Sequence, residues 1–554
     1  MSLLIDLFGY LSIVVHGLTI VAQSMALGGV LFLVLLARPL APRLGPPAEP
    51  ILRGVARIAA ISAFALMLCE LATVAMQVAV LVGTVHLGVL DTLHANFAEA
   101  GLTKALAAAL IGLMLSWRGV RAPGLPLIVL GAIVLAAATL TTHAEARLSD
   151  RLPLLAVEGL HQLGAAIWIG GMPCFLLALA HIHDGAGWRL VGARFSRMSM
   201  AGVAAILISG ITMSLVYIGD WQGFYGTAFG VMVGAKIAMF LMLLALGAGN
   251  FLLTERLRHD PATPVGRMRR FAEVELGIGI AIFFAAASLT SVPPAVDLQQ
   301  DRATIHDIIV RNTPEWPRLV SPDHDKLALP ALQAKLDAEA ARHDTKPESA
   351  FVPGSGELPP RNAADIAWSE YNHHWAGLFV LAVGFVSLLY QAGVRWAKHW
   401  PLLFLGLAGF LFVRSDPETW PLGDIGFFAS FRDVEVLQHR MFVAVLAVFA
   451  IFEWRVRLGK VKAAWPKLVF PLLCAAGGTL LLTHSHAISN VKEQLLIELT
   501  HTPLAILGIA AGWARWLELR LTEEDAPRLR RIAAWVWPIC FVLVGLLLLN
   551  YRES

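Results

Sequence analysis

Charged residues are scarce in this sequence, and their scarcity excludes most soluble folds. Lys, Arg, Asp and Glu make up 15% of the 554 residues, whereas 57% are hydrophobic. An average soluble protein has about 25% charged residues. Such a composition cannot cover a globule of this size with water-facing side chains. The formal net charge is only +3, so nothing argues for a nucleic-acid partner.

Cysteine pairs and enzyme motifs are missing as well. The four cysteines lie singly inside apolar runs, at Cys69, Cys174, Cys474 and Cys540. Without a C-x-x-C pair we expect neither disulfides nor covalently attached haem. The sequence has no nucleotide-binding loop, no G-x-S-x-G elbow and no H-E-x-x-H motif. We therefore predict that the protein is not an enzyme.

Long apolar runs fill most of the chain. A helix needs about 20 apolar residues to cross about 30 Å of hydrocarbon. The first run is too long for a cleaved signal peptide and lacks a basic start, so we interpret it as a membrane helix. We predict an all-α, polytopic membrane protein with about 14 transmembrane helices, near 4–37, 52–82, 101–117, 124–142, 153–181, 194–218, 228–253, 272–292, 371–394, 400–414, 436–453, 466–483, 493–516 and 532–550.

Basic residues gather in alternate loops, and this pattern predicts the topology. Loops rich in Lys and Arg stay in the cytoplasm, so the N-terminus and the C-terminus are both expected to be extracytoplasmic. The resulting organisation has an eight-helix membrane half over 1–294, an extracytoplasmic polar segment over 295–370 and a six-helix membrane half over 371–554.

One pattern of ionisable residues occurs twice in the outer half of the predicted membrane. A histidine ends one helix, and the next helix carries a Glu and a His three residues apart, which share a helix face. Imidazole and carboxylate groups that converge at one depth suit a transition-metal ion. The two sets are His143, Glu158 and His161, and His484, Glu498 and His501, the second with His486 beside it.

Further candidate metal ligands lie at similar depths. Thioether and thiol groups are soft donors that favour Cu(I), and the second apolar run contains Met67, Cys69 and Glu70. His16, His374 and His439 complete the candidate set. A plainer interpretation stays open, because a single intramembrane histidine is often a packing residue that hydrogen-bonds to a carbonyl. Glu273 and Glu275 equally suit a role in balancing the basic residues Arg269 and Arg270.

Several of these positions carry a family likeness. The segment from His161 to Gly171, with Trp168, Gly170 and Gly171, resembles the H-x-x-(small)-x-W-x-G-G helix of the copper resistance D (CopD) family. Further family-like points follow in order, at Arg194-Phe195-Ser196, Ser209-Gly210, Tyr225-Gly226, Lys236, Asn250, Arg270, Glu275, Leu289-Thr290 and Pro293-Pro294. The likeness covers 155–295 well, and the second half resembles the C-terminal extension of longer proteobacterial members.

The resemblance implies a multi-pass protein of the bacterial inner membrane that handles copper, as Cu(I) or Cu(II). It also implies a periplasmic copper-binding partner of the copper resistance C (CopC) type, besides the lipid bilayer itself. Copper transport is the function that we expect. Two alternatives stay open: a haem b electron carrier, in which paired histidines ligate the iron, and a copper sensor, chaperone or insertase that does not transport.

Overall fold

The computed structural model describes most of the chain. The described residues are 2–85, 87–142, 145, 150–260, 262–300, 302–323, 326–327, 363–417, 419–423, 425–432, 434–483 and 491–553. Within these ranges the side chains of 2–7, 432, 434–435, 438 and 491–494 are not described. The candidate ligands His143, His484 and His486 lie outside the described residues, as does half of the polar segment 295–370.

The described residues form helices and connecting turns, with one isolated bridge between Thr419 and Ile425. They group into two compact units. Unit 1 comprises Met1–Arg302 with Leu482–Ser485 and Leu521–Ala526. Unit 2 comprises Ala303–Leu481, His486–Arg520 and Pro527–Ser554.

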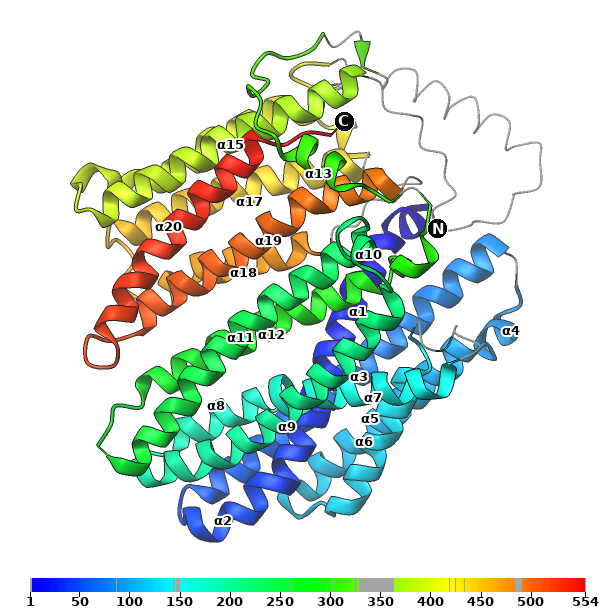
Figure 1. The fold of residues 1–554 in the computed structure, drawn as a ribbon, viewed down its shortest axis with the longest axis vertical. Helices are drawn as coiled ribbons and strands as arrows, with labels where there is room; N and C mark the ends of the chain where they lie inside the picture. The colour runs from blue at the N-terminus through cyan, green and yellow to red at the C-terminus, as the bar shows by residue number, and fades with distance from the viewer. Residues whose placement is uncertain are drawn as a thin grey trace. The chain divides into compact units, whose positions relative to one another are not determined.

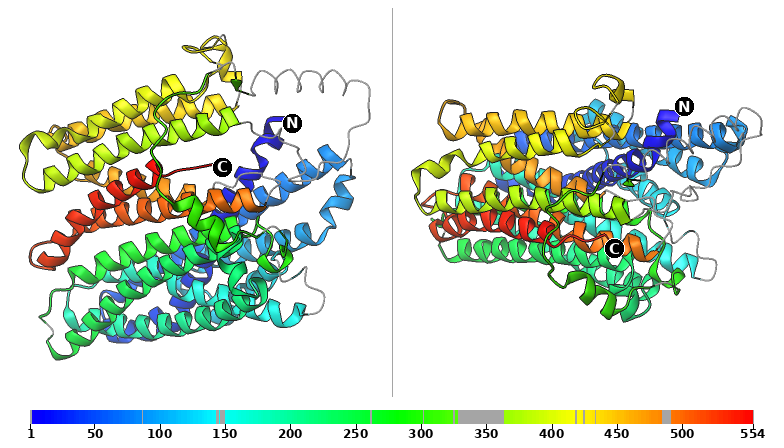
Figure 2. Two further views of the ribbon diagram at one scale, coloured as in Figure 1. Left: turned by 45° about the horizontal axis from the view of Figure 1, so that its top comes forward. Right: turned by 90° about the horizontal axis from the view of Figure 1, so that it is seen from above.

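Unit 1 contains the helices of the N-terminal part of the chain, from α1 to η4 (Figure 1). They are α1 (Ser2–Leu31), η1 (Phe32–Ala37), α2 (Arg38–Leu44), α3 (Ala48–Val85), α4 (Val89–Leu93), α5 (Asn96–Arg118), η2 (Gly119–Arg121), α6 (Gly124–Thr139), α7 (Arg151–Ala165), η3 (Ala166–Gly170), α8 (Met172–His181), α9 (Gly185–Tyr217), α10 (Trp221–Tyr225), α11 (Ala228–His259), α12 (Gly266–Leu289) and η4 (Ala295–Asp297). Helix α1 is central, because it packs against α3, η3 and α12. Helices α11 and α12 run side by side (Figure 2).

Unit 2 contains the helices that follow η4 along the chain. Its helices are α13 (Ile305–Asn312), α15 (Ala363–Gln391), η6 (Arg395–Leu402), α16 (Leu403–Arg414), η7 (Ala429–Arg432), α17 (Val434–Arg457), η8 (Trp465–Leu468), α18 (Val469–Leu481), α19 (Val491–Arg520) and α20 (Pro527–Leu549). Helix α20 packs against α15 and α19, and α18 packs against α19. An aromatic core around Trp400, Phe470 and Trp537 holds this unit together.

Each predicted apolar run coincides with a helix. By length and composition, eleven helices in the described part of the chain can cross a membrane. Two more are apolar but shorter, at Gly124–Thr139 and Trp465–Leu481. The 16 residues of Gly124–Thr139 give about 24 Å of helix, less than a full span. The remaining predicted span coincides with α17, which has 24 residues. The all-α, multi-pass membrane fold is therefore confirmed.

Candidate metal centre

His161 is held against α9 by a close approach of two helices. Gly164 of α7 and Gly202 of α9 face each other so closely that a Cβ atom on either would lie 2.6–2.8 Å from the other's carbonyl oxygen. Small residues of this kind let membrane helices pack tightly. One turn before Gly164, the Nδ1 atom of His161 lies 3.0 Å from the Oγ atom of Ser209 on α9.

The hydrogen bonds of Ser209 decide the tautomer of His161. The serine hydroxyl donates its single proton to the carbonyl oxygen of Ala205, at 2.6 Å. It can therefore only accept from His161, which must carry its proton on Nδ1. The Nε2 atom is then the nitrogen that can bind a metal ion, since a ligating imidazole usually donates its other N–H to a fixed acceptor.

A chain of amides orients the neighbouring carboxylate. Gln23 of α1 donates to the Oε1 atom of Gln162 at 2.9 Å, and Gln162 donates to the Oε1 atom of Glu158 at 3.1 Å. Lys236 of α11 interacts electrostatically with both Glu158 and His161. The predicted Glu158 and His161 pair thus shares its surroundings with a lysine that the metal hypothesis did not include.

The candidates on α1 and α3 form a second polar group. Glu70 and Lys104 of α5 make an ion pair of 2.5 Å whose side chains are 4% and 5% exposed. The thiol of Cys69 hydrogen-bonds to Thr19, and the charge of Lys104 also acts on His16. Glu70 is therefore engaged by a lysine. Met67 lies on the same helix and is half-buried.

Trp168 and Glu275, both points of the family resemblance, lie together. Glu275 of α12 is 2% exposed, accepts a hydrogen bond of 2.7 Å from Asn250 of α11 and another from the indole of Trp168. Glu273 instead pairs with Arg269 and Arg270. The interpretation that both glutamates balance the basic residues therefore holds for Glu273 and is wrong for Glu275.

In unit 2, both ring nitrogens of His374 are occupied. Its Nδ1 atom accepts from the backbone N–H of Arg318 at 2.7 Å, and its Nε2 atom lies 2.9 Å from the carbonyl oxygen of Tyr551. A carbonyl only accepts, so Nε2 carries the proton. The structure thus gives His374 the role of a packing residue, and we leave it out of the proposed site.

His439, whose side chain is 41% exposed, contacts a loop through the buried Asp416. Its Nδ1 atom lies 2.7 Å from the Oδ1 atom of Asp416. The next residue, Arg440, is 7% exposed and donates to the carbonyl oxygens of Phe412 and Trp420. These contacts connect Asp416 and Trp420 of the preceding loop to the start of α17.

His501 lies beside an aromatic group that the sequence did not reveal. Tyr551 stacks on His373 with ring centroids 3.8 Å apart, and the His373 and His501 centroids are 6.5 Å apart. The Nδ1 atom of His501 lies 3.0 Å from the carbonyl oxygen of Ile497. Glu498 accepts a hydrogen bond from Thr502 on its own helix.

The candidates do not converge on one centre. Within the described residues, no group of three or more His, Cys, Asp or Glu side chains could hold a metal ion. In each predicted set only the Glu and His of one helix are described, because His143 and His484 lie outside these ranges.

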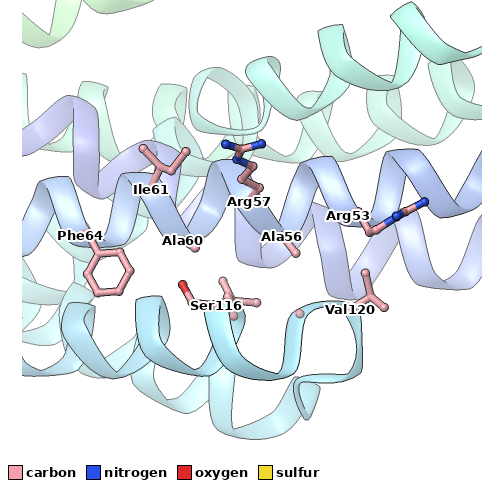
Figure 3. A pocket seen from close by; sticks show the side chains of 10 residues that line it. Arg53, Ala56, Arg57, Ala60, Ile61, Phe64, Ser116 and Val120 are labelled. Carbon is pink, nitrogen blue, oxygen red and sulfur yellow. The ribbon is translucent and has the colours of Figure 1, made fainter.

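A cavity of about 440 Å³ lies between α3 and α5 (Figure 3). Its lining includes Arg53, Arg57 and Ser116, with Ile61 and Phe64 as the apolar wall. Two guanidinium groups repel a cation, so this cavity is unsuited to copper.

Comparison with known proteins locates the family resemblance. Residues 189–289 match the family model described as Copper resistance protein D. This part of the chain is therefore similar to a CopD domain. The match includes Ser209, Lys236, Asn250 and Glu275, whereas His161 lies before it.

One relative supports the same family. The Copper transport protein CutJ of Bacillus subtilis (strain 168) is 32% identical over 172 residues. This match covers 30% of the present chain and 30% of CutJ, so the similarity spans less than a third of the relative. No solved structure matches the chain.

Proposed function

We propose that this protein transports copper ions across the bacterial inner membrane, and that His161 is a ligand at the entry to unit 1. The observation that carries the proposal is the hydrogen bond between His161 and Ser209, which directs Nε2 toward metal binding. Imidazole nitrogen suits copper. The similarity to a CopD domain and to a copper transport protein supports copper as the ion.

Glu158 is the second group that we assign to this site. Its carboxylate lies on the same helix face as His161 and is oriented by Gln162. A carboxylate offsets the charge of an ion inside the membrane, where an unpaired charge costs about 2.5–3.5 kcal/mol on insertion scales. We keep His143 in the proposal as a third ligand, from its place in the sequence.

The direction of approach follows from the loop charges. In unit 1, α2 with its basic residues lies at one end of the bundle, and α4 and α10 lie at the other (Figure 1). If the basic end is cytoplasmic, the N-terminus is extracytoplasmic and Glu158 lies in the outer half of the membrane. A periplasmic copper-binding protein of the CopC type would then deliver the ion.

Metal analysis of the purified full-length protein tests the site. We expect His161→Ala to lose copper relative to wild type, and His374→Gln to retain it, because both ring nitrogens of His374 are already hydrogen-bonded. Equal copper contents in wild type and His161→Ala would overturn the assignment of His161.

Reconstitution into liposomes tests transport separately. Entry of copper into liposomes that contain the protein, and its loss in His161→Ala, would support the proposal. Copper that binds without ever crossing would instead indicate a sensor, chaperone or insertase. A Soret absorbance band in the purified protein would support the haem b alternative.

A further inference from the structure

Glu275 is a buried acid without a charged partner. Its side chain lies inside unit 1, where the residue is 2% exposed, and its two hydrogen-bond donors, Asn250 and Trp168, are both neutral. No ion pair reaches it within the described part of the chain. Charge is expensive at such a place, because a buried charge must be paired or neutralised.

The described charged groups on the helices around Glu275 do not interact with its carboxyl group. The elements packed against α12 are α11, α1, α8 and η3. Lys236, on α11, is about four turns away from Asn250 along the helix. No charged group of the described residues acts on Glu275, including the titratable side chains of these elements and of α12 itself: Tyr10, His16, Cys174, His181, Lys236, Glu255, Arg256, Arg258, His259, Arg267, Arg269, Arg270 and Glu273.

Asn250 can hydrogen-bond to Glu275 whether the carboxyl group of Glu275 is protonated or ionised. Its amide NH₂ group donates to the Oε1 atom of Glu275 at 2.7 Å, as a carboxylate or a carbonyl oxygen requires. Its Oδ1 atom is buried and lacks a hydrogen-bond partner among the described residues. Rotation of the amide by half a turn would present this oxygen as an acceptor for a carboxylic acid O–H.

The local backbone places these groups at a break in the helix. Trp168 lies in η3, a π-helical segment between α7 and α8. Such segments inside α-helices are rare and occur frequently at functional sites. His161 lies on the same continuous helix, about two turns before Trp168. The acid therefore lies deeper in unit 1 than the proposed entry ligand.

We propose that Glu275 is a reversible proton-binding site, neutral when no ion is present and ionised when a copper ion passes. On ionisation the carboxyl O–H bond breaks, the proton leaves to an aqueous compartment, and the carboxylate offsets the charge of the ion. After the ion has left, the acid takes up a proton again. The coupling to copper rests on the proposed function, whereas the protonation of Glu275 does not.

Infrared spectroscopy of the full-length protein without metal tests the protonation alone. A protonated carboxylic acid has a carbonyl stretch that is separate from the bands of carboxylates. We expect such a band at neutral pH in wild type and in the matched control Glu273→Gln, and its loss in Glu275→Gln. Replacement of Asn250 by Leu should shift the band. A band of unchanged intensity in Glu275→Gln, or none in wild type, would overturn the proposal.

Liposomes that contain a pH-sensitive dye test the coupling. Copper entry through wild type and Glu273→Gln should move protons, whereas proton movement in Glu275→Gln should fall to the level of protein-free liposomes. If copper crosses all three proteins with the same proton movement, the coupling is wrong even though the proposed transport stands. If copper crosses none of them, the proposed function fails, and the infrared result still decides the protonation.

Discussion

The Nζ atom of Lys104 lies 2.5 Å from the Oε1 atom of Glu70, and both side chains are almost completely buried between α3 and α5. Breaking a buried pair leaves one charge uncompensated, which costs about 3–5 kcal/mol. Replacing both partners with neutral groups costs much less. The pair is thus a structural element whose loss can be distinguished from the loss of a ligand.

We expect Lys104→Met to destabilise the protein by about 3–5 kcal/mol, because Glu70 would remain buried without its partner. Thermal unfolding in detergent, monitored by circular dichroism, measures the effect. The double variant Glu70→Gln/Lys104→Met should recover most of the stability. Metal analysis of this double variant also decides the role of Glu70, since copper retained at the wild-type level excludes it as a ligand.

Removal of the Ser209 hydroxyl should weaken copper binding although serine itself touches no metal. In Ser209→Ala the Nδ1–H group of His161 loses the hydroxyl acceptor. The backbone of Ile206 also hydrogen-bonds to His161, so the ring loses one of the two contacts that fix its tautomer and orientation. Substitutions of this kind typically lower metal affinity about 10–100-fold. Copper titration measures the change. Ser209→Thr keeps a hydroxyl and should bind copper with the affinity of wild type. A lowered copper affinity in Ser209→Thr together with wild-type affinity in Ser209→Ala would contradict the role of the hydroxyl.

Lys236 should oppose metal binding. Its positive charge acts on His161, where a bound copper ion would add a second positive charge. We therefore expect Lys236→Met to bind copper more tightly than wild type at equal pH, and to release it more slowly in liposome assays. A weaker affinity in Lys236→Met would mean that the lysine holds Glu158 in place rather than repelling the ion.

The membrane fold was predictable from the sequence because hydrocarbon imposes a simple length rule on apolar segments. Every predicted run coincides with a helix, and the differences concern length, as in the 16-residue helix α6. The placement of Glu158 and His161 on one helix also follows from their spacing, whereas their joint binding of an ion stays a prediction. Contacts within one helix need no knowledge of how helices pack.

The partners of these residues could not be predicted in the same way. Lys104, Lys236 and Ser209 lie on other helices, and the packing that brings them to Glu70, Glu158 and His161 depends on close approaches such as that of Gly164 to Gly202. The two lysines did carry a usable signal, because a lysine within an apolar run marks a site by default. The different roles of Glu273 and Glu275 could not be predicted, because the sequence does not show which face of α12 packs inside unit 1.

The contact between α1 and η3 depends on two glycines. A Cβ atom on Gly170 would lie 1.9 Å from the carbonyl oxygen of Ser24, and one on Gly28 would lie 2.3 Å from that of Ala166. Gly170→Ala should therefore push the helices apart and destabilise unit 1, by an amount that thermal unfolding measures. Gly477→Ala is the matched control, because no described atom outside its own turn of helix lies within 4 Å of the added methyl. Equal stability of the two variants would contradict the close approach.

Asp220 should make the stability of unit 1 depend on pH outside the membrane. It caps α10 by accepting from the backbone N–H of Gly223, and it pairs with Arg302 at 2.8 Å. These two interactions hold the pKa of Asp220 below its usual value of 3.8, with the hydrogen bond from Gly223 as the larger cause. Because the folded-state pKa is the lower one, this stabilisation is present above the unfolded-state pKa and is lost as the pH falls through the folded-state pKa.

The variant Asp220→Asn keeps an acceptor for Gly223 but loses the ion pair with Arg302. We expect it to unfold at a lower temperature than wild type at neutral pH, with a difference that shrinks as the pH falls below the unfolded-state pKa of Asp220. Arg302 is itself held by the carbonyl oxygens of Ala295 and Leu298, so its position should survive the substitution. Thermal unfolding of both proteins across this pH range measures the difference, and one that stays constant at every pH would show that ionisation of Asp220 has no part in it.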